Sequence, residues 1–182
     1  VGTAAAPRFD PASAGTVGVL GPLVAFGGQQ PHFYNTETRS WTPLQTGAID
    51  QIVSSLGHLW LKAGGRLFRA SADGQVDLID TDTPVRKLAA TATRLVLLGD
   101  DYRIQFRTRV DGGWRLLKPA ASGPNLVELT KSNLVVAASG EDLYLAGTDQ
   151  RSAWHFSWRK QIWTPITDGN QQISRVKELA AD

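Results

Sequence analysis

One short motif returns four times along this chain of 182 residues and limits the folds that it can adopt. In this motif a tryptophan, or once a valine, is followed three positions later by an aliphatic residue. The four copies are Trp41/Leu44, Val76/Ile79, Trp114/Leu117 and Trp163/Ile166. They start 35, 38 and 49 residues apart, and the first two intervals are typical of repeats built from one small β-sheet. The longer third interval predicts an insertion in the fourth repeat.

Three further markers recur in the same order between the copies of this motif. The first is a pair of aliphatic residues three positions apart: Ile49/Ile52, Val85/Leu88, Leu126/Leu129 and Ile173/Val176. The second is a dense apolar run, at 23–26, 59–61, 95–98 and 134–138. The third is a segment rich in aromatic and aliphatic residues, at 32–34, 67–69, 104–107 and 143–145. Short apolar runs between glycine or aspartate turns favour strands over helices, so each repeat predicts four short strands.

The dense apolar runs predict inner strands that are covered on both faces. Their aliphatic side chains should therefore be almost fully buried. The residues concerned are Leu59, Leu61, Leu95, Leu97, Leu134 and Val136. A lone sheet of four short strands cannot bury both of its faces, whereas sheets stacked radially cover one another.

These observations predict an all-β fold, a β-propeller-like array of about four four-stranded blades. A sandwich or barrel built from similar hairpins is the alternative. We expect a flexible arm or linker at 1–15 and a propeller domain at 16–182. The expected repeats are 16–47, 48–83, 84–124 and 125–169.

The last residues, 170–182, admit two interpretations. Ile173, Val176 and Leu179 recur every third position among good helix formers, which is typical of a terminal helix. The same residues suit a closing strand that pairs beside 23–26 and completes a small ring. A chain that continues beyond these residues, as part of a larger ring, is the other possibility.

The stretch 41–74 resembles a tectonin-type repeat. It contains the motif Trp41/Leu44, then Gly47, the pair Ile49/Ile52, Leu59-Trp60 and the triplet 67–69. The neighbouring repeats match less well, and the pattern is also similar to regulator-of-chromosome-condensation repeats. The resemblance implies a propeller that acts as a recognition module. Proteins of this kind bind sugars and microbial surface glycans, or other proteins.

Nothing in the sequence predicts an enzyme or a cofactor. The absence of cysteine excludes disulfides, thiolate zinc sites and cysteine nucleophiles. The three histidines, His32, His58 and His155, are far apart and lack the spacing of a helical metal site. The net charge of +2 comes without a basic block, so we expect no nucleic-acid partner. No apolar run approaches the roughly 20 residues that cross a membrane as a helix.

The candidate binding site lies in the expected insertion of the fourth repeat. There Trp154, Phe156 and Trp158 alternate with polar residues, which is the period of a strand with one aromatic face. A basic pair follows the strand. We therefore predict that Trp154, His155, Trp158, Arg159 and Lys160 form a surface for a ligand or partner. The alternative is a hairpin whose aromatic face packs on the neighbouring blade.

Three functions are consistent with these features. The first is a non-enzymatic module for protein–protein interaction or assembly, because the aromatic surface occurs in one repeat only. The second is a lectin of the tectonin kind, which would bind carbohydrate or an anionic surface glycan. The third is a fragment of a larger propeller enzyme. The arm at 1–15, rich in alanine and proline, resembles linkers of exported bacterial proteins and predicts a secreted or periplasmic location.

Overall fold

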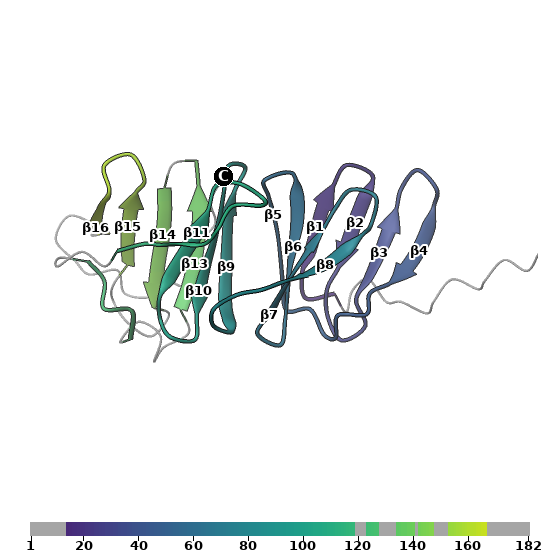
Figure 1. The fold of residues 1–182 in the computed structure, drawn as a ribbon, viewed down its shortest axis with the longest axis horizontal. Coiled ribbons are helices and arrows are strands. Elements are labelled where there is room, and N and C mark those ends of the chain that lie inside the picture. The colour runs from purple at the N-terminus through teal and green to yellow at the C-terminus, as the bar shows by residue number, and fades with distance from the viewer. Residues whose placement is uncertain (1–13, 119–122, 128–133, 141, 148–152, 167–182) are drawn as a thin grey trace, which may run out of the picture. The chain divides into compact units, whose positions relative to one another are not determined.

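The computed structural model describes residues 14–118, 123–127, 134–140, 142–147 and 153–166. These residues form four four-stranded antiparallel sheets, and the strands of each sheet follow one another in chain order (Figure 1). The chain divides into two compact units, Val1–Val85 and Arg86–Asp182, each of which holds two sheets. Among the described residues, no helix is long and apolar enough to cross a membrane.

The first unit contains sheets 1 and 2. Sheet 1 consists of four strands: β1 (Val17–Leu20), β2 (Leu23–Phe26), β3 (His32–Asn35) and β4 (Ser40–Pro43). Sheet 2 consists of four more: β5 (Gln51–Ser55), β6 (His58–Ala63), β7 (Arg66–Ala70) and β8 (Val76–Ile79). The turn between β6 and β7 is formed by Gly64 and Gly65, whose φ angles of 53° and 82° favour glycine.

The second unit contains sheets 3 and 4, and its first strand begins at the unit boundary. Sheet 3 consists of β9 (Val85–Thr91), β10 (Arg94–Gly99), β11 (Ile104–Arg107) and β12 (Arg115–Leu116). Sheet 4 consists of β13 (Leu134–Ser139), β14 (Asp142–Gly147), β15 (Ala153–Ser157) and β16 (Ile162–Ile166). Each of the four sheets falls within the range of one repeat expected from the sequence.

Sheet 4 corrects the strand assignment of the fourth repeat. The dense run at 134–138 belongs to β13, the first strand, and not to the second strand as in the other sheets. The aromatic segment is β15, an ordinary third strand hydrogen-bonded to β14 and β16. The prediction that 154–158 belongs to an insertion is therefore wrong, because its aromatic strand is the third strand of sheet 4. Leu129, expected in the first strand, lies outside the described residues.

Sheet 1 also contains a strand that the sequence analysis did not assign. β1 pairs with one edge of β2, in the register Val19 to Val24, and β3 pairs with the other edge. No edge of β2 is left for a closing strand, which corrects the expected pairing beside 23–26. The segment 170–182 itself, and 1–13 of the expected arm, lie outside the described residues.

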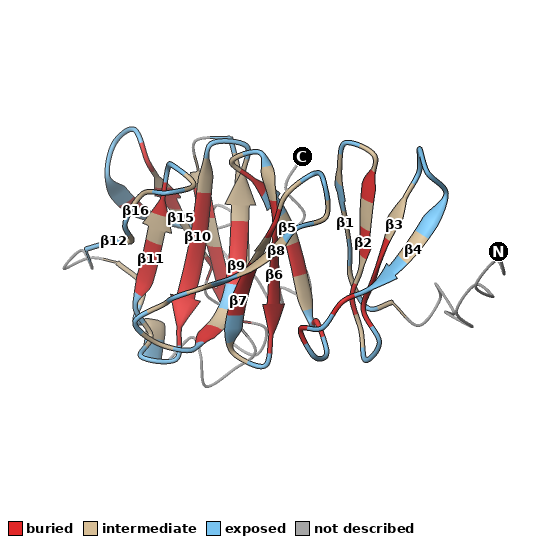
Figure 2. Cartoon of the chain, turned by 45° about the vertical axis from the view of Figure 1, so that its right-hand side comes forward, coloured by how far each residue is buried: buried red, intermediate tan, exposed pale blue. Residues whose placement is uncertain are grey.

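The inner strands contain the most completely buried side chains. Leu59 and Leu61 of β6 and Leu95 and Leu97 of β10 are buried, as predicted, and Figure 2 shows both strands coloured as buried over most of their length. Val136 is only partly buried, because β13 is a first strand and not an inner one. The side chain of Leu134 is outside the described part of the chain.

Sheets 1 and 2 pack face to face within the first unit. Their shared core joins Leu23, Ala25 and Phe33 of sheet 1 to Ile52 and Leu59 of sheet 2. Backbone hydrogen bonds add to this contact: the N–H of Gly28 donates to the carbonyl oxygen of Ile49 at 2.7 Å, and the N–H of Ile49 donates back at 3.0 Å.

Sheets 3 and 4 pack in a similar way within the second unit. Their shared core includes Val96, Leu98 and Ile104 from sheet 3 and Leu143 and Leu145 from sheet 4. The aromatic residues of β15 and β16 complete this core. In sheet 4 the inner strand is therefore β14, whose two leucines are completely buried.

Gly18 allows the close approach of sheets 1 and 2, and this generates a prediction. A Cβ atom at Gly18 would overlap the side chain of Ile52 and crowd that of Leu59. We expect Gly18→Ala to lower the free energy of unfolding by about 1–3 kcal/mol through overpacking. Chemical denaturation followed by tryptophan fluorescence measures this change.

Gly15→Ala is the matched control, because a Cβ atom at Gly15 would meet no other atom within 4 Å. Equal stability of the two variants would contradict the packing described for Gly18.

Candidate functional site

The aromatic side chains of β15, and that of Trp158 directly after it, belong mainly to the core. Phe156 is buried, and Trp158 is 6% exposed. The Trp158 ring lies 4.6 Å from the Phe106 ring and 5.0 Å from the Phe156 ring, centroid to centroid. The guanidinium of Arg94 lies 5.3 Å from the centroid of the same indole. Trp158 is thus enclosed by its neighbours, and Trp154 is half-buried against the same core.

His155 lies on the opposite face of β15 and has partners on β14. Its Nε2 atom is 2.8 Å from Oδ1 of Asp142, an ion pair when the imidazole is protonated. Its ring stacks on Tyr144 with the centroids 5.2 Å apart and the planes at 24°. The structure therefore separates His155 from the tryptophans of the predicted site, because neighbouring residues of a strand point to opposite faces.

Arg159 and Lys160 are exposed in the turn between β15 and β16. Backbone contacts fix this turn: the N–H of Gln161 donates to the carbonyl oxygen of Ser157 at 2.7 Å, and the Gln161 side-chain amide donates to that of Trp158 at 2.6 Å. Of the predicted site, these two cations are the exposed part. The geometry does not combine them with an exposed aromatic surface.

A pocket that the sequence analysis missed lies elsewhere in the second unit. Its volume is about 520 Å³, and we call it the corner pocket because it lies where β11 begins and β12 ends. Its buried lining is apolar and consists of Ile104, Leu117 and Trp163. Leu126 contributes a further, half-buried apolar side chain.

Two aliphatic side chains of the corner pocket are exposed to solvent. Leu116 is 48% exposed and Val127 is 47% exposed. Scattered exposed aliphatic residues are normal on protein surfaces, but these two lie beside an apolar hollow, which makes the corner a candidate binding surface. The sequence signal was the third position of the recurring motif, where Leu116 replaces the proline found at Pro43 and Pro165.

The charged side chains of the corner pocket come from the turn before β11 and the residue after Leu117. Oδ1 of Asp101 accepts a hydrogen bond from the backbone N–H of Arg103 at 3.1 Å, which closes the turn. Oδ2 of Asp101 is 3.7 Å from Nε of Arg103, whose side chain is 68% exposed. Tyr102, between them, has a φ of 61°. Lys118 is exposed and has no ion-pair partner among the described residues.

Sheet 2 has a hollow at the corresponding corner, in the first unit. It has a volume of about 430 Å³ and is lined by Arg66, Leu78 and Ile79, which correspond to Arg103, Leu116 and Leu117. The correspondence follows from strand pairing. Leu78 pairs with Phe68, two residues after Arg66, and Leu116 pairs with Gln105, two residues after Arg103. The charges differ, since Asp80 and Asp82 line the sheet 2 hollow.

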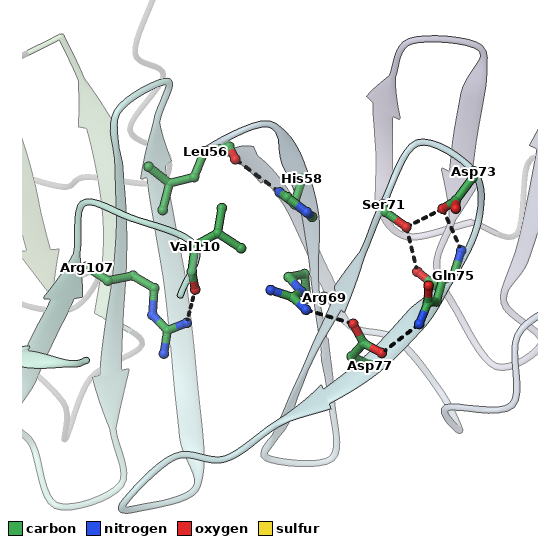
Figure 3. A network of polar contacts seen from close by, with 9 residues as sticks. All are labelled: Leu56, His58, Arg69, Ser71, Asp73, Gln75, Asp77, Arg107 and Val110. Carbon is green, nitrogen blue, oxygen red and sulfur yellow. Dashed lines mark hydrogen bonds and ion pairs between the residues drawn. The ribbon is translucent and has the colours of Figure 1, made fainter. Parts of the chain in front are cut away.

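A polar network lies in and beside the turn between β7 and β8, and Figure 3 shows it. The carboxylate of Asp77 accepts hydrogen bonds from Arg69 at 2.8 Å and from the Gln75 side chain at 3.4 Å. Asp73 accepts a hydrogen bond from the Ser71 hydroxyl and another from the backbone N–H of Gln75 at 3.2 Å. These bonds, the Ser71 hydroxyl first, hold the pKa of Asp73 below its ordinary value of 3.8.

The described residues offer no candidate metal centre. No group of three or more histidine, cysteine, aspartate or glutamate side chains lies together in the described part of the chain. The Nδ1–H of His58 donates locally to the carbonyl oxygen of Leu56 at 3.0 Å. His32 makes a similar contact with the carbonyl oxygen of Gln30 at 2.9 Å.

Comparisons with known proteins extend the description of the fold. A scan against family models finds no match, and no curated protein matches the chain. Solved structures do match. A chain of the mitotic checkpoint complex aligns with a TM-score of 0.57 and 12% identity, over 92% of this chain and 58% of that one. Virginiamycin B lyase from Staphylococcus aureus aligns with a TM-score of 0.55 and 12% identity, over 91% and 59%.

The N-terminal domain of Nup159 is a third similar structure. It aligns with a TM-score of 0.53 and 12% identity, over 78% of this chain and 44% of that chain. The chain thus spans less than two thirds of the length of each of these structures. At such identities the similarity shows the fold alone, and it confirms the predicted all-β, β-propeller-like array of four-stranded sheets. It supports a propeller in general and not the tectonin type in particular.

Trp158 and the neighbouring cations should behave differently on substitution. Because Trp158 is enclosed by Phe106 and Phe156, we expect Trp158→Ala to lower the free energy of unfolding by about 3–5 kcal/mol. Arg159→Ala combined with Lys160→Ala should change it by less than about 1 kcal/mol, since both side chains are exposed. Urea denaturation measures both. A Trp158→Ala protein as stable as the parent would show that the ring is not part of the core.

The hydrogen bond between Ser71 and Asp73 predicts a pH effect. The ionised carboxylate contributes stability above its ordinary pKa, and this contribution is lost as the pH falls through the lowered pKa of the folded state. Ser71→Ala should raise the pKa of Asp73 toward 3.8, which NMR titration of the carboxyl carbon measures. Ser40→Ala is the control, because that hydroxyl bonds Thr38 instead. An Asp73 pKa that Ser71→Ala leaves unchanged would contradict this assignment.

Proposed function

We propose that this chain is a non-enzymatic protein-recognition module that serves interaction or assembly. The observation that carries the proposal is the corner pocket of sheet 3. Its lining is mainly apolar, and it has exposed leucine and valine side chains beside it and a cationic rim. Protein interfaces combine these features, an apolar centre with a polar and charged periphery.

The exposed aliphatic side chains support a macromolecular partner. Leu116 and Val127 extend the apolar surface beyond the hollow itself, so a partner that covers them gains burial that a ligand confined to the hollow does not. The similar structures include one determined as part of the mitotic checkpoint complex, which is a protein assembly. That role belongs to that protein, and for this chain it supports only the general proposal.

A lectin of the tectonin kind is the alternative that the resemblance of 41–74 implies. Such a lectin would repeat its sugar-binding residues from blade to blade. The corners of sheets 2 and 3 share an arginine and a leucine, but Tyr102 and Lys118 of the corner pocket correspond to Gly65 and Asp80. Because Tyr102 and Lys118 have no counterpart of the same kind in sheet 2, the pockets favour a single protein site over repeated sugar sites. No specific observation among the described residues favours an enzyme fragment.

Affinity capture with site variants tests the proposal. The full chain is immobilised and exposed to protein extracts and culture medium of its source organism, beside Leu116→Asp and the double variant Arg159→Ala with Lys160→Ala. We expect the parent and the double variant to retain the same protein, and Leu116→Asp to lose it. Circular dichroism checks that every variant is folded.

A glycan array with the same proteins separates the alternatives. Binding to defined glycans that Leu116→Asp leaves intact, together with no captured protein, would contradict the proposed function and support the lectin. Capture that only the double variant abolishes would keep protein recognition but move it to the turn between β15 and β16.

A further inference from the structure

We infer that the corner pocket binds an extended acidic segment of a partner protein, with an apolar side chain in the hollow and a carboxylate beside it. This inference rests on the proposed function and adds the chemistry of the partner. It follows from three observations: the apolar lining, the excess of positive charge at the rim, and the position of the pocket at the edge of a sheet.

The lining selects an apolar side chain. Ile104, Leu117 and Trp163 are buried residues of the core shared by sheets 3 and 4, so this part of the pocket has a fixed shape. A volume of about 520 Å³ is typical of pockets that enclose a ligand. A polar side chain in such a place would lose its hydration without finding hydrogen-bond partners, which disfavours it.

The rim selects a carboxylate. Among the described residues of the lining, Arg103 and Lys118 contribute two positive charges, and Asp101 contributes one negative charge. Both carboxylate oxygens of Asp101 already contact Arg103 within the turn: Oδ1 accepts from its backbone N–H, and Oδ2 faces its Nε. Asp101 is therefore less available to an incoming cation. The Arg103 ion pair is long and its side chain mostly exposed, so an incoming carboxylate can share the guanidinium at little cost.

The sheet edge selects an extended segment. β12 is the last strand of sheet 3, and among the described residues it pairs with β11 on one side only. A peptide that lies along β12 would place one side chain in the hollow while its backbone follows the exposed Arg115–Leu116 strand. A compact small molecule would gain nothing from this edge, so the geometry favours a peptide.

The hollow of sheet 2 provides an internal comparison. Its exposed leucine, Leu78, is 61% exposed and corresponds to Leu116. The carboxylates of Asp80 and Asp82 line that hollow against the single cation of Arg66. Like charges repel an acidic segment there, so the two corners should differ in their ligands although they share an exposed leucine.

A selection experiment tests the inference with the full chain. A displayed library of random linear peptides is selected for binding to the parent protein, and the enriched sequences are compared with those selected on Leu116→Asp. We expect the peptides enriched on the parent to contain a large apolar residue beside aspartate or glutamate. The same peptides should not be enriched in the selection on Leu116→Asp. Enrichment of basic peptides, or of the same peptides on both proteins, overturns the inference.

Affinities of one enriched peptide then assign the contacts. Fluorescence anisotropy of the labelled peptide should show a loss of at least about tenfold with Leu116→Asp and with Lys118→Glu. Leu78→Asp, the matched control in sheet 2, should leave the affinity unchanged. The affinity for the parent should fall as salt is added, because the rim contacts are exposed. Equal losses with Leu78→Asp and Leu116→Asp would overturn the assignment to the corner pocket.

Two further readouts keep the result interpretable. If Leu116→Asp lowers the melting temperature, the affinity of Lys118→Glu for the peptide decides whether the corner pocket binds it. Lys118 is exposed and has no ion-pair partner among the described residues, so this substitution should leave the fold intact. If no peptide is enriched while affinity capture still depends on Leu116, this inference fails and the proposed function stands. If capture and peptide selection both fail, the proposed function fails as well.

Discussion

Burial of both faces of a small sheet is the constraint on which this structure depends. In sheets 2 and 3 the second strand, β6 or β10, is buried at every position but its first, not at alternate positions. β6 is the clearest case: Leu59 and Leu61 belong to the core shared with sheet 1, and Trp60 on the opposite face is equally buried. The side chains of such a strand cannot be covered by its own sheet, so both faces of the strand require packing partners.

Polar groups of β6 are met by partners close in the chain. The indole N–H of Trp60 donates to the backbone carbonyl oxygen of Ser55 at 3.0 Å. Lys62, at the end of β6, places its amino group 2.6 Å from a carboxylate oxygen of Asp50, a residue just before β5. An unpaired cation at this depth would cost several kcal/mol, so the pair explains how a lysine fits in an inner strand.

The recurring tryptophan motif serves packing, which leaves its third position free for function. Trp163 is buried, Trp114 lies under the guanidinium of Arg107 at 4.0 Å, and Trp41 packs on Tyr34 at 4.8 Å. The third position is exposed in all four copies: Pro43, Leu78, Leu116 and Pro165. Proline and leucine can exchange there without disturbing the core, so this position can carry recognition.

The sequence predicts the sheets better than the site, and the reason is physical. Inner strands such as 59–61 and 95–98 are apolar because burial requires it, and so the pattern identifies them directly. In the fourth repeat two apolar runs compete, 134–138 and 143–145, and composition does not tell which is inner. The choice of the first run assigned 143–145 to the third strand instead of the second, and it made the actual third strand look like an insertion. Trp158 was then interpreted as a ligand surface, although its ring faces Phe106.

A pocket is harder to predict because it depends on residues from separate segments. Nothing in the linear order connects Arg103 with Lys118 or Val127, and only the pairing of β11 with β12 brings the first two to one corner. The exposed leucine supplies apolar contact in sheets 2 and 3 alike, so it cannot by itself distinguish one partner from another. The residue two positions after this leucine can distinguish partners, because it is Asp80 in sheet 2 and Lys118 in sheet 3. Discrimination by charge beside a shared apolar contact requires no change in the core, because both residues lie outside it.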